Sequence, residues 1–370
     1  MARTIRHLSL HRIGRVELRV VADVEEGTLP ILEAEETVLR QYVQRADWPH
    51  RWVTLFILQD MEPLIRQLTL GGSASSASRS PEGASTGEGA SLPPGGAAAL
   101  NYRPVVNVYD LANPAGCQVF VNRQAMVREG YWDDPLAVQG LFAHEHAHPL
   151  AENVVTSASR RLKLELTPHW GFGTSSTAPG NRQSRVIPLL AVLADKLCAY
   201  APRELFANEL AIQSGLDAAL LHLDLRTMAT AGRTVAGRVE LQRQLQLEVT
   251  QGGLAKAAAE LLLLIGDLRG YLDLALETAP FYRAGKEAAG RELETVLEAE
   301  IFPHLEPAAV DAYTALCRHY VSLRDDFTPR GLIKWGEGVL GILANSLAGK
   351  GLDLQYRLYL ADSRAASSSQ

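Results

Sequence analysis

The sequence predicts an α+β protein, with a small mixed sheet and its helices in residues 1–224 and an all-α helical region in residues 225–360. Three observations lead to this prediction. Short runs rich in valine and aromatic residues alternate with helical patterns in the first part of the chain. From about residue 202 onward, apolar residues recur at helical spacing. The composition, 47% hydrophobic over 370 residues, is ample for buried cores.

The first part of the chain predicts four strands and two helices. The strand-like segments are residues 15–24, 51–59, 104–111 and 117–122, the last two joined by a turn through Asn113-Pro114-Ala115-Gly116. A helix is expected over 29–46, where Pro30 lies near the start, and a shorter one around 62–70. The strands and helices alternate, which is why a sheet covered by helices is expected.

Two segments have the composition of disordered chain. Residues 71–100 consist almost entirely of Gly, Ser, Ala and Pro, which bury too little apolar surface to offset their loss of conformational entropy. Strand-like segments resume directly afterwards, so this stretch is interpreted as an insertion within the first domain. The tail, residues 361–370, is also expected to be disordered, and a long loop or flap is expected over 167–182.

The remainder of the chain is predicted to be helical. The expected helices cover residues 186–200, 202–223, 235–249, 254–276, 287–302, 307–325 and 329–347. Their leucine-rich faces are typical of a packed bundle, which forms the second domain and offers a surface for a protein partner.

Composition also narrows the class of protein. A net charge of -6 and no long basic run give no reason to expect nucleic acid as a partner. The longest apolar run is far shorter than the ~20 residues that span a bilayer, so no membrane association is expected. The three cysteines are far apart and odd in number, which suggests free thiols in a reducing compartment. A cytoplasmic protein is the resulting expectation.

The segment Leu141–Asn153 contains the main chemical motif. His144-Glu145-His146-Ala147-His148 matches HExxH, and Asp134 and Pro135 provide a good helix start before it. On a helix, this spacing places two imidazoles on one face, where they can hold zinc while Glu145 acts as general base on a water. A structural histidine cluster and an HxHxH strand are the alternatives. Pro149 is expected to end or kink the helix at His148.

A second motif lies 56 residues beyond His148, where residues 204–211 read ELFANELA and fit the form ExxA(N/D)xxA. With this motif, residues 14–224 resemble the gluzincin type of zinc metallopeptidase, particularly the minimal gluzincins and the peptidases related to ImmA and to HtpX. The resemblance implies a zincin-like domain for residues 1–224. It does not extend to the C-terminal helical region.

The resemblance implies a set of site residues. The zinc ligands would be His144, His148 and Glu204, with Glu145 as base and proton shuttle, and Asn208 would accept a ring N–H from a ligating histidine. The alternative form NExxA would make Glu209 the third ligand. Glu204 and Glu209 lie about 140° apart on a regular helix and cannot both face one metal. The sequence favours Glu204.

The expected function is zinc-dependent hydrolysis of peptide bonds in a peptide or protein substrate. His169, Tyr131 and Tyr200 are candidates for stabilising the oxyanion. The strand over 117–122 is expected to lie beside the site and to pair with an extended peptide. Two alternatives remain open: a non-catalytic regulatory or interaction protein on a metallopeptidase scaffold, and a metal-dependent hydrolase of a non-peptide bond.

Overall fold

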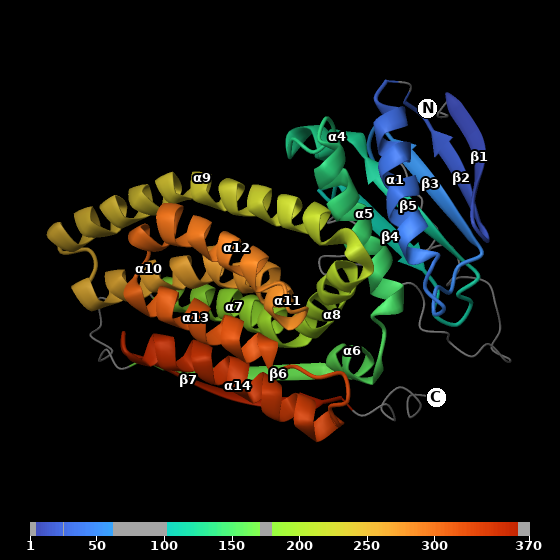
Figure 1. Cartoon of the computed structure of the whole chain (residues 1–370). Coiled ribbons are helices and arrows are strands. Elements are labelled where there is room, and N and C mark those ends of the chain that lie inside the picture. The colour runs from blue at the N-terminus through green and yellow to red at the C-terminus, as the bar shows by residue number, and fades with distance from the viewer. Residues whose placement is uncertain (1–4, 25, 62–101, 171–179, 362–370) are drawn as a thin grey trace, which may run out of the picture. The chain divides into compact units, whose positions relative to one another are not determined.

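The computed structural model describes residues 5–24, 26–61, 102–170 and 180–361 (Figure 1). The chain divides into two compact units, each built from two separate segments. Unit 1 comprises residues 1–150 and 210–223, and unit 2 comprises residues 151–209 and 224–370. The helix expected around 62–70, the insertion over 71–100 and the tail from 362 onward lie outside the described residues.

Unit 1 contains the small mixed sheet that the sequence predicts. Its strand order is β1-β2-β3-β5-β4, with parallel pairing of β2 to β3 and β3 to β5 and antiparallel pairing at both ends. The strands are β1 (His7–Ile13), β2 (Val16–Ala22), β3 (Trp52–Leu58), β4 (Val105–Tyr109) and β5 (Gly116–Asn122). The predicted hairpin between the last two strands is confirmed.

Strand β1 is missing from the sequence-based prediction. Two of its three apolar side chains are exposed, Leu8 at 72% and Leu10 at 66%, and only Ile13 at its end is buried. The opposite face is polar, and Ser9 Oγ lies 3.0 Å from His7 Nε2 and 2.9 Å from His11 Nε2. A strand with this distribution lacks the buried apolar face by which strands are usually recognised.

Helices α1 (Thr28–Tyr42) and α5 (Pro135–Leu150) pack against each other in unit 1 (Figure 1). The Tyr42 hydroxyl donates a hydrogen bond of 2.7 Å to the Ala143 carbonyl, and burial raises the pKa of Tyr42. Unit 1 also contains α4 (Arg123–Arg128), a π-helical turn (Ile212–Leu216) and the first residues of α9 (Asp217–Thr250). At Gly140 on α5, a Cβ would lie 2.6 Å from the Ala219 carbonyl oxygen, so only glycine allows this approach to α9.

Unit 2 is mainly helical and also contains a two-stranded antiparallel sheet of β6 (Leu162–Trp170) and β7 (Leu352–Leu360). Its helices are α6 (Val154–Ser159), α7 (Gly180–Asp195), α8 (Ala201–Ala211), the remainder of α9, α10 (Lys256–Tyr271), α11 (Ala275–Arg283), α12 (Glu287–Glu300), α13 (Pro307–Val321) and α14 (Pro329–Ala348). A π-helical turn (Lys196–Tyr200) joins α7 to α8, and 3-10 turns cover Leu272–Leu274 and Phe302–His304.

Two expectations about unit 2 are wrong. The C-terminal region is not all-α, because β7 lies within it, and residues 167–170 are not a loop, because they belong to β6. Both segments begin with an alternation of apolar and polar residues, LKLEL and LDLQY, which is typical of strands and which the prediction overlooked. Their pairing joins residues almost 200 positions apart, such as Leu162 and Leu360. This pairing also explains why residues 151–209 belong with the helical unit, although the sequence suggests a boundary at 224.

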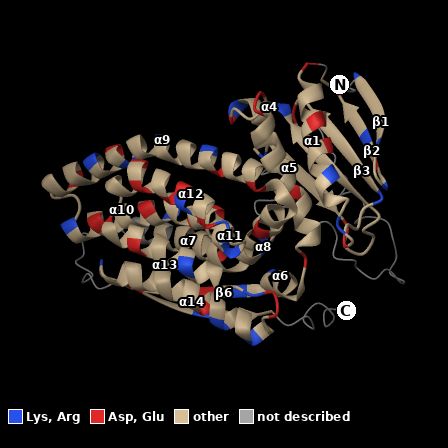
Figure 2. Ribbon diagram, in the orientation of Figure 1, with Lys and Arg blue, Asp and Glu red and all other residues tan. Residues whose placement is uncertain are grey.

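Charged side chains of both signs are interspersed along the helices of unit 2 (Figure 2). Among the buried ones, Asp267 on α10 receives hydrogen bonds from Arg238 Nε at 3.0 Å and from the Glu306 backbone N–H at 2.8 Å. A buried carboxylate needs such partners to offset its desolvation. No helix in the described ranges is long and apolar enough to cross a membrane.

His50, between α1 and β3, makes the stability of unit 1 depend on pH. Its Nδ1–H donates to the Pro114 carbonyl at 2.7 Å. Burial, with a smaller contribution from nearby His146, lowers its pKa from 6.5 to about 4. The unfolded chain therefore binds the proton first as pH falls. The stability contribution is complete above pH 6.5 and is lost between pH 6.5 and 4.

We predict that unit 1 loses about 2 kcal/mol of stability between pH 7.5 and pH 5 because of His50. In His50→Asn, which keeps a donor for Pro114, the drop in Tm over this pH range should be smaller than in wild type by about 4–8 °C. Differential scanning fluorimetry at the two pH values measures this. His304→Asn, at an exposed position, is the control. An undiminished drop in His50→Asn would contradict the assignment.

Candidate metal centre

Helix α5 carries the HExxH motif and begins where the sequence predicts. The Asp134 carboxylate accepts a hydrogen bond of 3.1 Å from the Ala137 backbone N–H at the helix start. The other oxygen of Asp134 lies 2.8 Å from His222 Nε2 on α9. The helix continues to Leu150, two residues beyond His148. Both histidines of the motif therefore lie within the helix, and the expectation that Pro149 ends it at His148 is wrong, because Pro149 itself lies inside the helix.

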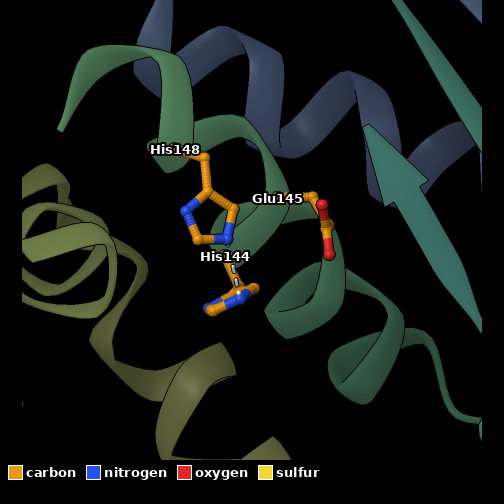
Figure 3. A group of neighbouring side chains, drawn as sticks. All are labelled: His144, Glu145 and His148. Carbon is orange, nitrogen blue, oxygen red and sulfur yellow. Dashed lines mark hydrogen bonds between the residues drawn. The ribbon is translucent and has the colours of Figure 1, made fainter. Parts of the chain in front are cut away.

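His144 and His148 present their imidazoles to each other one turn apart (Figure 3). Their Nε2 atoms are 3.1 Å apart, and the ring planes are 82° from parallel. Two nitrogen ligands of one tetrahedral zinc ion are separated by about 3.3 Å, given Zn–N distances of ~2.0–2.1 Å. The two nitrogens therefore have a separation that fits a shared ion.

Glu145 completes a group of three side chains. Within the described part of the chain, ligand atoms of His144, Glu145 and His148 all lie within 4.8 Å of one another, a spacing able to hold a metal ion. His144 is partly exposed, whereas His148 and Glu145 are buried. Two imidazoles and one carboxylate form a donor set that several divalent transition metals accept. The geometry supports a metal site without selecting the metal.

Asn107 on β4 contacts Glu145 twice. Its backbone N–H donates to Glu145 Oε2 at 3.1 Å, and its side-chain Nδ2 donates to the Glu145 carbonyl oxygen at 3.1 Å. Sequence reasoning missed Asn107. The available signal was a single polar residue within the apolar run PVVNVY.

His146, the middle histidine of the motif, neither faces solvent nor belongs to the group of His144, Glu145 and His148. His146 is fully buried, and its Nε2 lies 2.7 Å from Glu35 Oε1 on α1, which is also fully buried. Two helical positions correspond to about 200°, so His146 must point away from the side of α5 that carries His144 and His148. Glu35 was missed as well, although a glutamate between the buried residues Ile31 and Leu39 on one helix suggested a paired charge.

The second motif lies on α8, whose residues 201–209 belong to unit 2. Glu204 and Asn208 are buried, at 7% and 2% exposure, and Asn208 Nδ2 lies 3.4 Å from the Leu276 carbonyl oxygen. Glu209 accepts hydrogen bonds from Arg283 Nε at 3.0 Å and Nη2 at 2.6 Å. Arg283 is itself buried and also donates to the Tyr320 carbonyl at 3.1 Å. The Glu209 carboxylate thus connects α8 to α11.

The three oxyanion candidates lie on different elements. Tyr131 belongs to unit 1 and precedes α5, Tyr200 lies in the π-helical turn of unit 2, and His169 is exposed on β6. None belongs to the group of His144, Glu145 and His148.

The expectation that residues 117–122 pair with a peptide is wrong. These residues form β5, which is bonded to β3 on one side and to β4 on the other and so has no free edge. Among the described strands of this sheet, β4 is the outermost next to β5, and it is the strand that contacts α5 through Asn107.

Comparisons with protein-family models, with curated proteins and with solved structures find no match for this chain.

We predict that the three histidines of α5 divide into two classes by metal content. After loading with zinc and desalting, elemental analysis should find about one ion per wild-type chain and a loss in His144→Ala and in His148→Ala, because each removes a nitrogen of the close pair. His146→Gln keeps a polar group facing Glu35 and should retain the metal. Equal losses in all three variants would contradict this division.

Proposed function

We propose that this protein is a zinc-dependent metallopeptidase of the gluzincin type, with a zincin-like domain. The observation that carries the proposal is the His144–His148 pair, with its 3.1 Å separation of Nε2 atoms and with Glu145 between the two residues on the same helix. Zinc is the metal proposed, because this donor set together with a glutamate on a second helix is typical of catalytic zinc sites.

In the proposed reaction, the two histidines and Glu145 have different roles. His144 and His148 would hold the ion through their Nε2 atoms, and zinc bound there would polarise a carbonyl group and make water more acidic. Glu145 takes a proton from the attacking water and passes it to the leaving amine. Burial of Glu145 limits competition from bulk water at its carboxylate. The products are a new carboxylate and a new amine.

Glu204 is proposed as the third zinc ligand and Asn208 as the residue that orients a ligating histidine. The choice of Glu204 over Glu209 is supported by the hydrogen bonds of Glu209, whose carboxylate is paired with the buried guanidinium of Arg283. Withdrawing that carboxylate would leave Arg283 buried without its counter-ion, which is costly. Glu204 and Asn208 fit the ExxA(N/D) motif one helical turn apart.

The proposed substrate is an extended peptide that adds to the outer edge of β4. Residues 105 and 109 alternate with residues that face β5, so their backbone groups point to this edge, whereas the Asn107 N–H between them is bonded to Glu145 Oε2. A peptide paired there would lie beside Glu145, which Asn107 contacts from the same edge. Backbone pairing binds many sequences with little dependence on side chains. The substrate class is therefore an unstructured segment of a protein or peptide.

We predict that Glu145→Gln abolishes hydrolysis of an unstructured protein such as β-casein while retaining zinc. Glutamine has the size of glutamate but cannot accept the water proton, so the rate should fall by at least ~100-fold. Cleavage is followed by gel electrophoresis and mass spectrometry, with zinc content measured on the same samples. If the zinc-loaded wild type cleaves no more than Glu145→Gln does, the peptidase proposal fails and a binding role on a metallopeptidase scaffold replaces it.

We also predict that Glu204→Gln loses zinc whereas Glu209→Gln retains it. Both variants conserve size, and Glu209→Gln keeps an oxygen for Arg283 although it loses the counter-ion, so zinc affinity is compared only between folded samples. Zinc affinity is measured by competition with a chromophoric chelator, and circular dichroism verifies the fold. Loss of zinc in Glu209→Gln with retention in Glu204→Gln would reverse the ligand assignment.

A further inference from the structure

Pro149 leaves a gap in the hydrogen bonds of α5. In a regular helix the backbone N–H of residue 149 would donate to the carbonyl oxygen of residue 145, but proline has no N–H. The affected carbonyl belongs to Glu145, which is buried and is the residue proposed as general base. A buried carbonyl oxygen needs another donor.

Asn107 supplies that donor from outside the helix. Its Nδ2 lies 3.1 Å from the Glu145 carbonyl oxygen, and its backbone N–H lies 3.1 Å from Glu145 Oε2. Asn107 is itself 8% exposed and lies in the middle of β4, so its position is set by the sheet. One residue thus holds both the main chain and the carboxylate of Glu145.

We propose that Asn107 is a positioning residue for Glu145, and that its side chain is required because Pro149 follows His148. The inference rests on the proposed function for its catalytic consequence, but the coupling between positions 107 and 149 does not. Leucine at 107 has the same branched shape, with a larger volume, but no donor, and aspartate would place a carboxylate against a carbonyl oxygen. Only a short side chain with an N–H meets the requirement.

The proposal is tested with Asn107→Leu, Pro149→Ala and the double variant in the full-length chain. The Tm is measured in the presence of a chelator, so neither zinc nor activity affects it. Asn107→Leu should lower the Tm of unit 1 by about 2–4 °C, the shift typical for loss of one buried hydrogen bond. In the Pro149→Ala background, Asn107→Leu should lower the Tm by less than half as much, because the introduced alanine provides an N–H for the Glu145 carbonyl.

Asn122→Leu is the matched control. Asn122 is a buried asparagine in the same sheet, and its side chain accepts a hydrogen bond from the Ala125 N–H at the start of α4. Its effect should be the same in both backgrounds, because it shares no partner with Pro149. If Asn107→Leu does not fold, Asn107→Ala replaces it. Equal decreases in Tm on substitution of Asn107 in the wild-type and Pro149→Ala backgrounds would overturn the proposal.

Kinetics separate positioning of Glu145 from stability alone. In the zinc-loaded protein well below its Tm, Asn107→Leu should lower kcat on β-casein about tenfold with KM and zinc content unchanged, and Pro149→Ala should restore part of that loss. An unchanged kcat in a variant with lowered Tm would overturn the positioning role. If the Tm effects of the substitutions at 107 and 149 are coupled but the wild type cleaves nothing, the contact is supported and the peptidase function is refuted. Failure of the positioning proposal can therefore be told from failure of the proposed function.

Discussion

The contact between His146 and Glu35 determines how α5 is oriented in unit 1. Both side chains are fully buried and lie 2.7 Å apart, so either one alone would be a polar group without its partner in the interior. The pair therefore favours one rotation of α5 about its axis. In that rotation His144 and His148 point away from α1, and the motif can serve as a site and not as part of the core.

A second constraint comes from prolines in the two helices that carry the motifs. Pro149 deprives the Glu145 carbonyl of its helical donor, and Asn107 replaces it. The π-helical turn before α8 presents the same problem: the Ala201 N–H donates to the Lys196 carbonyl, and Pro202 has no N–H for the Leu197 carbonyl. The Tyr320 hydroxyl donates to that carbonyl at 3.0 Å. In both places a residue distant in sequence satisfies a carbonyl that proline leaves unpaired.

The polar residues of the two motifs therefore fall into two groups. Some hold helices together, and others form the candidate metal site. His146 and Glu209 hold helices together, through Glu35 and Arg283 respectively. His144 and His148 form the close pair of nitrogens. A motif of neighbouring polar residues on a helix thus separates into opposite faces, because successive positions are about 100° apart.

Short-range patterns predicted much of this molecule. The HExxH helix, its aspartate cap and the close pair of His144 and His148 follow from local spacing, since a helix fixes the directions of residues four apart. Strand β1, the pairing of β6 with β7 and the burial of His146 depended on tertiary structure. An alternating pattern indicates a strand but not its partner, and Leu162 meets Leu360 only in the folded chain. Likewise, the roles of Glu35 and Asn107 arise from helix and sheet packing, which brings together residues whose separation along the chain carries no signal.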